Sequence, residues 1–499
     1  MPTLTNLIAK NVRTNRPGES VVVDAGQWRE IAGLLRDNVL TLSALWGHAA
    51  GVRMALLEEA AGQMAVICLP CPDGRFPSVG RLHPAAIRLE RAIHDLFGFV
   101  PEDAPDLRPW LDHGRWGIDQ PLGAARASAG AAPYPFLPAE GESLHQIAVG
   151  PVHAGIIEPG HFRFTANGEA IVRLEARLGY THKGVERLMQ GADLDRAAKL
   201  AGRVSGDSTV AYAIAFARAS EVALGIEAPP RAHWLRALMA ELERLANHLG
   251  DIGAICNDAS FALMHAHCGI LRERVLRTSD TCFGHRLMRD RVVPGGVSID
   301  LDVECTHELR ALLVALKRRL PALVELYDNT ASLQDRTVGT GIVKPALARQ
   351  FGAGGYVGRA SGRHFDARRA FAYPPYDSLR FEVPVLEEGD VNARVWIRIK
   401  EVEQSLSLIE QILDRLPGGP VLFALSRRSG EGLALVEGFR GDIFLWLRLD
   451  ASGRVERCHL RDPSWFQWPL LEAAVEGNIV ADFPLCNKSF NCSYSGHDL

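Results

Sequence analysis

The sequence lacks long apolar runs and lacks an excess of either charge. None of the uninterrupted apolar stretches among its 499 residues approaches the roughly 18–20 residues that cross a bilayer. Its 55 Lys and Arg stand against 59 Asp and Glu, which gives a formal net charge of −4. Proteins that bind nucleic acid usually carry a basic excess or a basic stripe. We therefore expect no nucleic-acid partner, and we expect any membrane contact to run through other subunits.

Cysteine is also scarce. The nine cysteines are scattered and odd in number, which in a chain of this length indicates free thiols in a reducing compartment, so we expect a cytoplasmic location. Their spacing matches no iron–sulfur ligand set. Cys68 and Cys71 have CxxC spacing but no second pair at zinc spacing. We interpret them as buried thiols, with a metal or redox role as the alternative.

Low-complexity sequence is confined to one place. Residues 123–138 consist mostly of Gly, Ala and Pro, a composition that buries too little apolar surface to order itself and is typical of a linker. The sequence thus predicts an N-terminal domain over 1–122, a linker over 123–138 and a large domain over 139–499. Because such a linker carries few inter-domain contacts, we expect residues 1–122 to fold by themselves.

Hydrophobic periodicity predicts the elements on either side of this linker. In the N-terminal domain it predicts helices over 27–38 and 82–98 and a strand over 65–69. In the large domain it predicts short strands within 144–178, long helices within 187–287, a helix over 306–328 interrupted at Pro321, a helix over 390–416, and strands over 433–437 and 443–449. The predicted fold class is an α/β N-terminal domain followed by an α+β large domain.

Several motifs occur in a fixed order along the chain. PSVGRLHPAAIRLERAIHDLFGF at 77–99 and PDLRPWL at 105–111 resemble the small (30-kDa-type) hydrophilic subunit of respiratory complex I. After the linker, GPVH at 150–153, EPGHFRF at 158–164 and GYTHKGVER at 179–187 resemble the large subunits of nickel–iron hydrogenases and the related 49-kDa-type subunit of complex I.

The fusion of both parts resembles the large subunit of group 4, membrane-bound hydrogenases of the formate-hydrogenlyase and hydrogenase-4 type. This resemblance implies an oxidoreductase subunit whose large domain is a hydrogenase-large-subunit-like helical bundle with flanking small β-sheets.

The same resemblance places a nickel–iron centre on four thiolates, since soft sulfur ligands hold nickel. The positions that match these ligands are Ser205, Ser208, Cys492 and Ser495. A serine hydroxyl is too hard a ligand, with too high a pKa, to replace a nickel thiolate. We therefore expect no nickel–iron centre and no other cofactor on this chain, and we expect the nearest iron–sulfur cluster on a partner subunit.

Four polar residues remain as candidates for proton transfer. Glu158 matches a glutamate that passes protons in hydrogenases, while His153 and Asp258 match an interacting pair of complex I. Asp207 adds a carboxylate between two of the lost ligand positions. Such groups exchange protons when burial tunes their pKa values. The structural alternatives are that Glu158 caps a turn, that His153 packs, and that Asp207 pairs with Arg203.

The function that the resemblance implies is that of a peripheral subunit of a membrane-bound, complex-I-like redox complex. It would couple electron transfer from an iron–sulfur small subunit (20-kDa-like) to ion or proton translocation, alongside a ferredoxin-like subunit and antiporter-like membrane subunits, on the inner face of the cell membrane. One alternative is a reductase of quinone or another small acceptor, although Gly206 stands where complex I has its quinone-site tyrosine. Another is a structural subunit with a vestigial site.

The serines at the ligand positions generate a direct prediction. We expect the purified protein to contain no stoichiometric nickel, because three of the four thiolates are replaced. Elemental analysis of the purified chain measures this. About one nickel per chain would contradict it.

Overall fold

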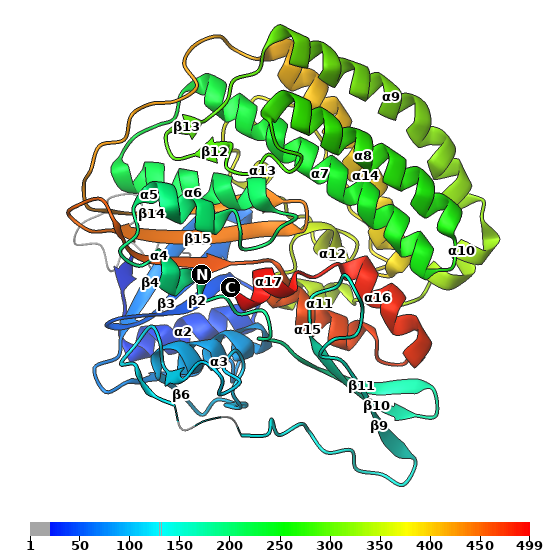
Figure 1. Cartoon of the computed structure of the whole chain (residues 1–499). Coiled ribbons are helices and arrows are strands. Elements are labelled where there is room, and N and C mark those ends of the chain that lie inside the picture. The colour runs from blue at the N-terminus through cyan, green and yellow to red at the C-terminus, as the bar shows by residue number, and fades with distance from the viewer. Residues whose placement is uncertain (1–19, 129, 131) are drawn as a thin grey trace.

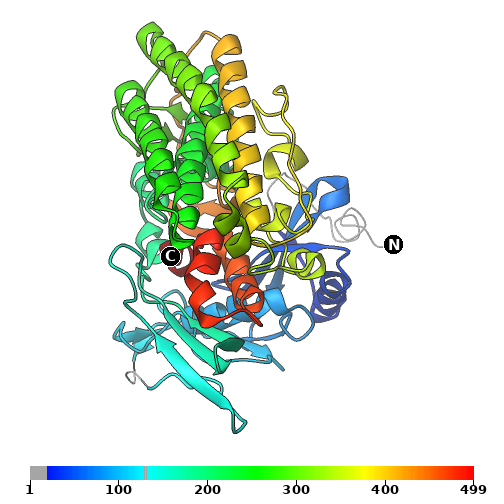
Figure 2. The same ribbon diagram turned by 90° about the vertical axis from the view of Figure 1, so that its right-hand side faces the viewer.

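The computed structural model describes residues 20–128, 130 and 132–499. These residues form a mixed α/β structure of several small sheets and long helices (Figures 1 and 2). The chain begins with a four-stranded sheet in which β1 pairs parallel to β4 and the other pairs are antiparallel. In spatial order its strands are β1 (Val21–Val22), β4 (Gln63–Pro70), β3 (Gly51–Glu58) and β2 (Thr41–His48).

Two helices accompany this sheet, and local sequence explains where each of them begins or ends. Helix α2 (Ala25–Arg36) begins at a capping box in which the Asp24 side chain accepts from the backbone of Gln27. Helix α3 (Ile87–Phe97) follows a 3₁₀ turn and ends at Gly98, which has φ +78° and so adopts the left-handed conformation that glycine tolerates. These helices and β4 confirm the three elements predicted for this part of the chain.

Helices dominate the remainder. They are α4 (Val185–Met189), α5 (Leu194–Ala201), α6 (Thr209–Leu224), α7 (Pro230–Asp258), α8 (Ala262–Phe283), α9 (Val303–Asp328), α10 (Ala331–Thr337), α11 (Pro345–Gln350), α12 (Gly355–Arg359), α13 (Ala367–Ala370), α14 (Val391–Arg415), α15 (Ser464–Ala474), α16 (Phe483–Phe490) and α17 (Tyr494–Asp498). The long helices α7, α8, α9 and α14 pack against one another and run side by side (Figure 2). Their apolar faces share one large core.

The predicted interruption of a helix at Pro321 is wrong. Helix α9 continues through this residue. Pro321 lies on the exposed side, where the lost hydrogen bond is open to water. On the other side, Leu316, Leu320 and Leu323 are buried in the core and hold both halves of the helix in line.

Two further three-stranded sheets follow the linker region. They are β9 (Leu144–Val149), β10 (His161–Asn167) and β11 (Ala170–Arg177), and later β14 (Gly430–Gly438), β15 (Gly441–Leu449) and β16 (Val455–Arg461). Short pairs join β5 (Arg75–Pro77) to β6 (Val100–Glu102), β7 (Ile118–Asp119) to β8 (Arg126–Ala127), and β12 (Val292–Val293) to β13 (Gly296–Val297). Strand β16 was not predicted, because its sequence VERCHLR is too polar to show a strand pattern.

The N-terminal sheet packs directly on the last sheet. Trp46 of β2 contacts the rings of Phe444 and Trp446 of β15 at centroid distances of 5.5 and 5.7 Å. A second cluster joins the N-terminal part to β10, β11 and α15. The proposed division at 123–138 stays a prediction; residues 1–19 of the first domain lie outside the described residues. The shared core shows that the first part buries apolar surface against the rest.

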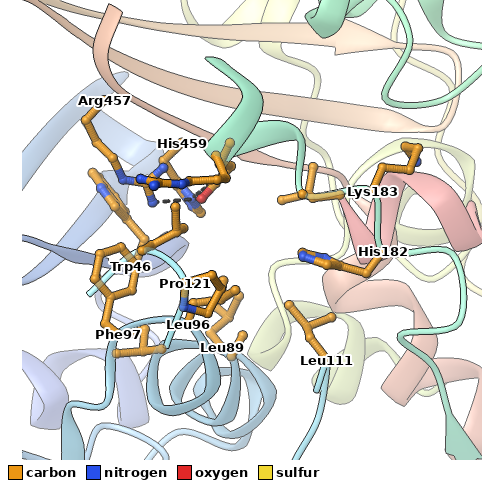
Figure 3. A pocket seen from close by; sticks show the side chains of 18 of the residues that line it. Trp46, Leu89, Leu96, Phe97, Leu111, Pro121, His182, Lys183, Arg457 and His459 are labelled. Carbon is orange, nitrogen blue, oxygen red and sulfur yellow. Dashed lines mark hydrogen bonds and ion pairs between the residues drawn. The ribbon is translucent and has the colours of Figure 1, made fainter. Parts of the chain in front are cut away.

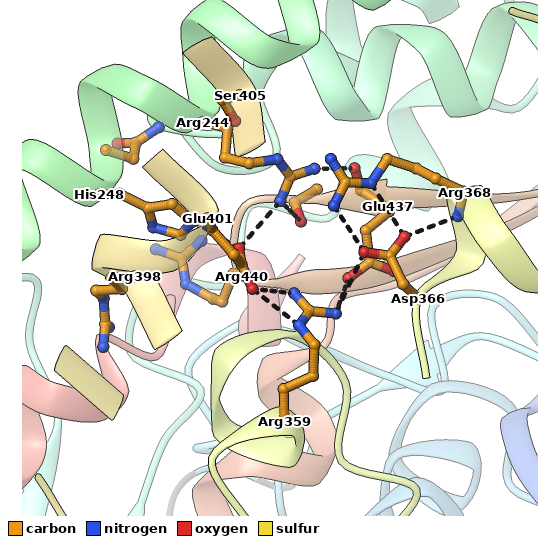
Figure 4. A network of polar contacts seen from close by, with 12 residues as sticks. Arg244, His248, Arg359, Asp366, Arg368, Arg398, Glu401, Ser405, Glu437 and Arg440 are labelled. Atoms are coloured by element: carbon orange, nitrogen blue, oxygen red, sulfur yellow. Dashed lines mark hydrogen bonds and ion pairs between the residues drawn. The ribbon is translucent and has the colours of Figure 1, made fainter. Parts of the chain in front are cut away.

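A set of buried charges, which we call the buried ion network, connects the helical bundle to β14 (Figure 4). Arg359 is central: its Nε lies 2.8 Å from Glu401 of α14 and its Nη1 lies 2.9 Å from Glu437 of β14. All three residues are 1 % exposed. The other members are Glu241, Arg244, Asp366 and Arg368. Each charge in this dry interior is stabilised only by its partners.

Removing the central cation should therefore destabilise the whole chain. We expect Arg359→Leu to lower the free energy of unfolding by about 3–5 kcal/mol, since it leaves buried carboxylates uncompensated. The matched control is Arg310→Leu, which removes an exposed ion pair with Asp414 and should cost less than about 1 kcal/mol. Urea unfolding of the two variants measures the difference, and equal midpoints would contradict the prediction.

Candidate functional site

A cavity of about 480 Å³ lies where the β9–β10 loop, the α5–α6 turn and the C-terminal helices meet. It gathers most of the residues singled out from the sequence, although these are far apart in the chain. The predicted residues that line it are His153, Glu158, Ser205, Asp207, Asp258, Cys492 and Ser495. Ser208 lies behind this wall, buried at the start of α6.

Asp207 is held in the α5–α6 turn by a guanidinium from a distant hairpin. Arg440, in the turn between β14 and β15, donates to Asp207 Oδ2 at 2.7 Å. The Ser205 hydroxyl donates to Asp207 Oδ1, also at 2.7 Å. Burial alone would raise the pKa of the Asp207 carboxyl, but the charge and hydrogen bonds of Arg440 bring it below its ordinary value. Asp207 therefore stays ionised.

The expected pairing of Asp207 with Arg203 is wrong. Arg203 points away and forms a bidentate pair with Asp290, with both distances 2.7 Å. His182 and Glu186 are four residues apart, a spacing that would suit a pair on one helix face, but no hydrogen bond or ion pair joins them among the described residues. Glu186 accepts instead from Arg457 and His459.

The C-terminal wall is built from the turn between α16 and α17. Ser493 caps α17, since its hydroxyl accepts from the backbone of Gly496, and it lies 2.8 Å from the Ser205 hydroxyl across the cavity floor. The Ser495 backbone donates to Glu158 Oε2 at 2.9 Å. Glu158 thus binds the C-terminal turn, not its own turn, and its side chain remains exposed toward the cavity.

An imidazole and a phenol face each other at the mouth of the cavity. The Tyr494 hydroxyl lies 3.4 Å from His153 Nε2. Burial lowers the pKa of His153, so its ring is neutral near pH 7. Asp258, the last residue of α7, has a pKa raised by burial and forms no hydrogen bond with His153 among the described residues. Tyr212 of α6 donates to Asp462 and does not line the cavity.

The four positions that match nickel ligands do not fit a nickel–iron centre. Three carry hydroxyls, which are poor nickel ligands, and Cys492 supplies the one thiol that remains at these positions. The Arg440 guanidinium lies 3.3 Å from the Ser208 hydroxyl, so a fixed cation stands beside the ligand positions. Within residues 20–128, 130 and 132–499, no three His, Cys, Asp or Glu side chains are grouped to hold a metal ion.

Sequence reasoning missed several residues of this wall. Arg440 is the most consequential, because it neutralises Asp207; the only local signal is its place in the Gly-Phe-Arg-Gly hairpin turn. The others are Asn487, Lys488, Asn491 and Ser493. Ser493 was detectable as a possible helix cap, since serine at that position accepts from the first turn.

Comparison with known proteins supplies the family. Residues 21–127 match the model for the respiratory-chain NADH dehydrogenase 30 Kd subunit, and residues 260–429 and 424–498 match that for the 49 Kd subunit. The chain is 32 % identical to formate hydrogenlyase subunit 5 of Escherichia coli, over 85 % of this chain and 77 % of that protein. It belongs to the NADH dehydrogenase 49 Kd subunit family. The resemblance inferred from the motifs is confirmed.

Two further relatives differ in how much of this chain they match. The chain is 31 % identical to hydrogenase-4 component G of Escherichia coli, over 91 % of this chain and 81 % of that protein. It is 33 % identical to an NADH-quinone oxidoreductase subunit of Syntrophobacter fumaroxidans, over 70 % of this chain and 95 % of the other. The relatives are oxidoreductase subunits, and the chain is one by family.

A solved structure agrees with this assignment. It is that of the membrane-bound sulfane sulfur reductase, an archaeal respiratory membrane complex; one of its chains matches with a TM-score of 0.68 and 27 % identity, over 72 % of this chain and 99 % of that chain. In the present structure, none of the helices formed by the described residues is both long enough and apolar enough to span a bilayer.

The turn that holds Asp207 also contacts a protonated acid, which generates a prediction about pH. Glu243 of α7 is buried and accepts from the backbone of Val210 and Ala211 at 2.7 and 3.1 Å. Burial, together with the charge of Asp207, raises the pKa of Glu243 to about 8. In the unfolded chain the value returns to about 4.3. The native protein therefore holds a proton that the unfolded chain has lost, and stability falls as the pH rises from 5 to 8.

We expect Glu243→Gln to flatten this slope, because the amide is neutral throughout. Its oxygen can accept from one of the two backbone N–H groups while its NH2 group faces the other, which lowers stability equally at both pH values. Between pH 5 and 8 the variant should therefore lose less stability than the unmutated chain, by a few kcal/mol at most, since one pKa unit is worth about 1.4 kcal/mol. Urea midpoints at pH 5 and 8 measure this, with the exposed Glu227→Gln as the control. An unchanged slope would show that Glu243 is ionised in the native state.

Proposed function

We propose that this chain is the peripheral subunit of a membrane-bound, complex-I-like redox complex that works without nickel–iron. It couples electron transfer from a partner iron–sulfur subunit to ion or proton translocation. One observation carries the proposal: the cavity of the family's metal site keeps Glu158, His153 and Asp258 but lines the ligand positions with hydroxyls. Groups that move protons are present, whereas the donor set for nickel is not.

The groups of the cavity differ in what they can do with a proton. Asp207 is fixed and kept ionised by Arg440, so we assign it the role of holding the local charge. Glu158 is exposed to the cavity, and its Oε2 accepts from the Ser495 backbone amide, while its Oε1 has no hydrogen bond with any residue that the structure describes. Burial raises the pKa of Asp258 and lowers the pKa of His153, so in both cases it favours the uncharged form. Serine hydroxyls between them can order water.

The surface beside the cavity has features expected of a contact with a partner subunit. Val152 and Ile156, in the β9–β10 loop, are 81 % and 98 % exposed, which is unusual for apolar side chains at the mouth of a polar cavity. In our proposal an iron–sulfur small subunit of the 20-kDa type covers this loop and brings its cluster to the cavity. A ferredoxin-like subunit and antiporter-like membrane subunits complete the complex, on the cytoplasmic face of the cell membrane.

The names of the relatives support this assembly. Formate hydrogenlyase subunit 5, hydrogenase-4 component G and the NADH-quinone oxidoreductase subunit are by name parts of larger enzymes, and the matched solved chain belongs to a respiratory membrane complex. We also propose that the bundle of α7, α8, α9 and α14, with its flanking small sheets, is the hydrogenase-large-subunit-like part of the chain.

A second candidate is the reduction of a quinone or another small acceptor within the cavity. It is favoured by one contact, the 3.4 Å approach of the Tyr494 hydroxyl to His153 Nε2. Two such groups at one mouth can bind the oxygens of a small acceptor, even though Gly206 replaces the tyrosine of complex I. The two candidates differ in whether the acceptor enters this chain.

Glu158→Gln tests the proton-transfer role. The amide oxygen can still accept from the Ser495 backbone, so assembly should be intact, but the titrating proton is lost. With the donor and acceptor found by screening the purified complex, we expect turnover or coupling to fall at least about tenfold, because a positioned acid or base contributes typically 10²–10⁴-fold. Glu142→Gln, in an exposed loop outside the cavity, is the matched control. An assembled Glu158→Gln complex that turns over at the unmutated rate would eliminate this role.

A further inference from the structure

A second cavity, of about 340 Å³, lies between the N-terminal part and the large part of the chain (Figure 3). No residue lines both this cavity and the one described above. Its wall is largely apolar and aromatic, and comes from β2, α3 and the segments that follow α3. The side chains that define its shape are Trp46, Leu89, Leu96, Phe97, Leu111 and Trp116. Cavities of this size and character bind small molecules.

One imidazole faces into this apolar space. His182 points toward the centre of the cavity (Figure 3), and its ring packs on Trp116 at a centroid distance of 4.5 Å. Its Nδ1 lies 2.6 Å from the carbonyl oxygen of Asp498, so Nδ1 carries the proton and donates it. Burial lowers the pKa of His182, which keeps the ring neutral. Its Nε2 is therefore an acceptor, and it has no donor among the described residues.

The polar groups of the opposite wall are closed off from the cavity. His459 Nδ1 lies 2.7 Å from Glu186, whose carboxylate also accepts from Arg457. His459 Nε2, Trp46 Nε1 and Arg457 Nε have no partner among the described residues, but protein encloses each of them, so a ligand in the cavity cannot reach them. Recognition of a polar group on a ligand therefore depends on His182.

The charges at the rim argue against an acidic ligand. The Lys183 ammonium is turned away to the carbonyl oxygens of Val204 and Ser495. Arg187 donates to Gln190. A carboxylate in the cavity would compete with these existing hydrogen bonds for the two cations. It would also carry no proton to donate to His182. A hydroxyl, in contrast, donates to an imidazole Nε2 and accepts from an N–H at the same time.

We propose that this cavity binds a small molecule with an aromatic or alicyclic body and a hydroxyl group, a phenol-class ligand. The body fills the space between α3 and the indole rings, and the hydroxyl donates to His182 Nε2. This site shares no lining residue with the proton-transfer cavity and is independent of it.

A pair of probes that differ only in the hydroxyl tests the proposal on the full chain. The probes are 1-naphthol and 1-methoxynaphthalene, titrated by calorimetry. We expect 1-naphthol to bind at one site, and 1-methoxynaphthalene to bind at least about fivefold more weakly, which is the effect of one net hydrogen bond. Equal affinities, or no binding of either probe at millimolar concentration, would overturn the proposal.

Two variants locate the site. His182→Phe keeps the ring on Trp116 but removes the acceptor, so it should weaken 1-naphthol to the level of 1-methoxynaphthalene and leave the latter unchanged. Ala92→Trp fills the cavity from α3 and should abolish binding of both probes. His145→Phe, on the exposed face of β9, is the matched control. Thermal unfolding confirms that each variant is folded; unchanged 1-naphthol affinity in folded Ala92→Trp would place binding elsewhere and overturn the assignment.

Discussion

The buried ion network around Arg359 is the constraint on which the remaining structure depends. Charges removed from water are stable only when their partners are in place, so Glu401 of α14, Glu437 of β14 and Glu241 of α7 must arrive together. This requirement fixes the helical bundle against the last sheet. The hairpin turn that carries Arg440 begins directly after β14. The position of the guanidinium that holds Asp207 is thus a consequence of ion pairs made deep in the bundle.

Much of the fold was predictable because it follows local rules. The apolar stripes of α3, α7 and α14 have helical spacing; Gly98 ends α3, Pro230 begins α7 and Asp390 caps the start of α14. The errors occur where distant packing decides. Strand β16 looks polar because Arg457 and His459 point toward Glu186. Glu186 lies 273 residues before His459 in the chain, so local sequence gives no sign of this contact. Pro321 is tolerated because leucines on the opposite face are anchored in the core.

Part of the candidate site was predictable from sequence, but its pairings were not. Motifs shared with the family identified residues from four separate segments, and the structure brings all but Ser208 to the wall of one cavity. The partner of Asp207 could not be read from sequence, because Arg440 is 233 residues away and Arg203 is only four. The roles of these residues in proton transfer stay predictions. The spacing of residues in the sequence does not show which cation pairs with which carboxylate. This pairing decides whether a carboxylate stays ionised or can take up a proton.

The Asp207–Arg440 pair would oppose the construction of a nickel site in this cavity. Exchanging the three serines for cysteines would place thiols beside a guanidinium that already lies 3.3 Å from the hydroxyl of Ser208. Arg440 could not move aside for a metal ion without leaving the carboxylate of Asp207 uncompensated. A redesigned site would therefore need the thiols and the removal of this ion pair in the same variant.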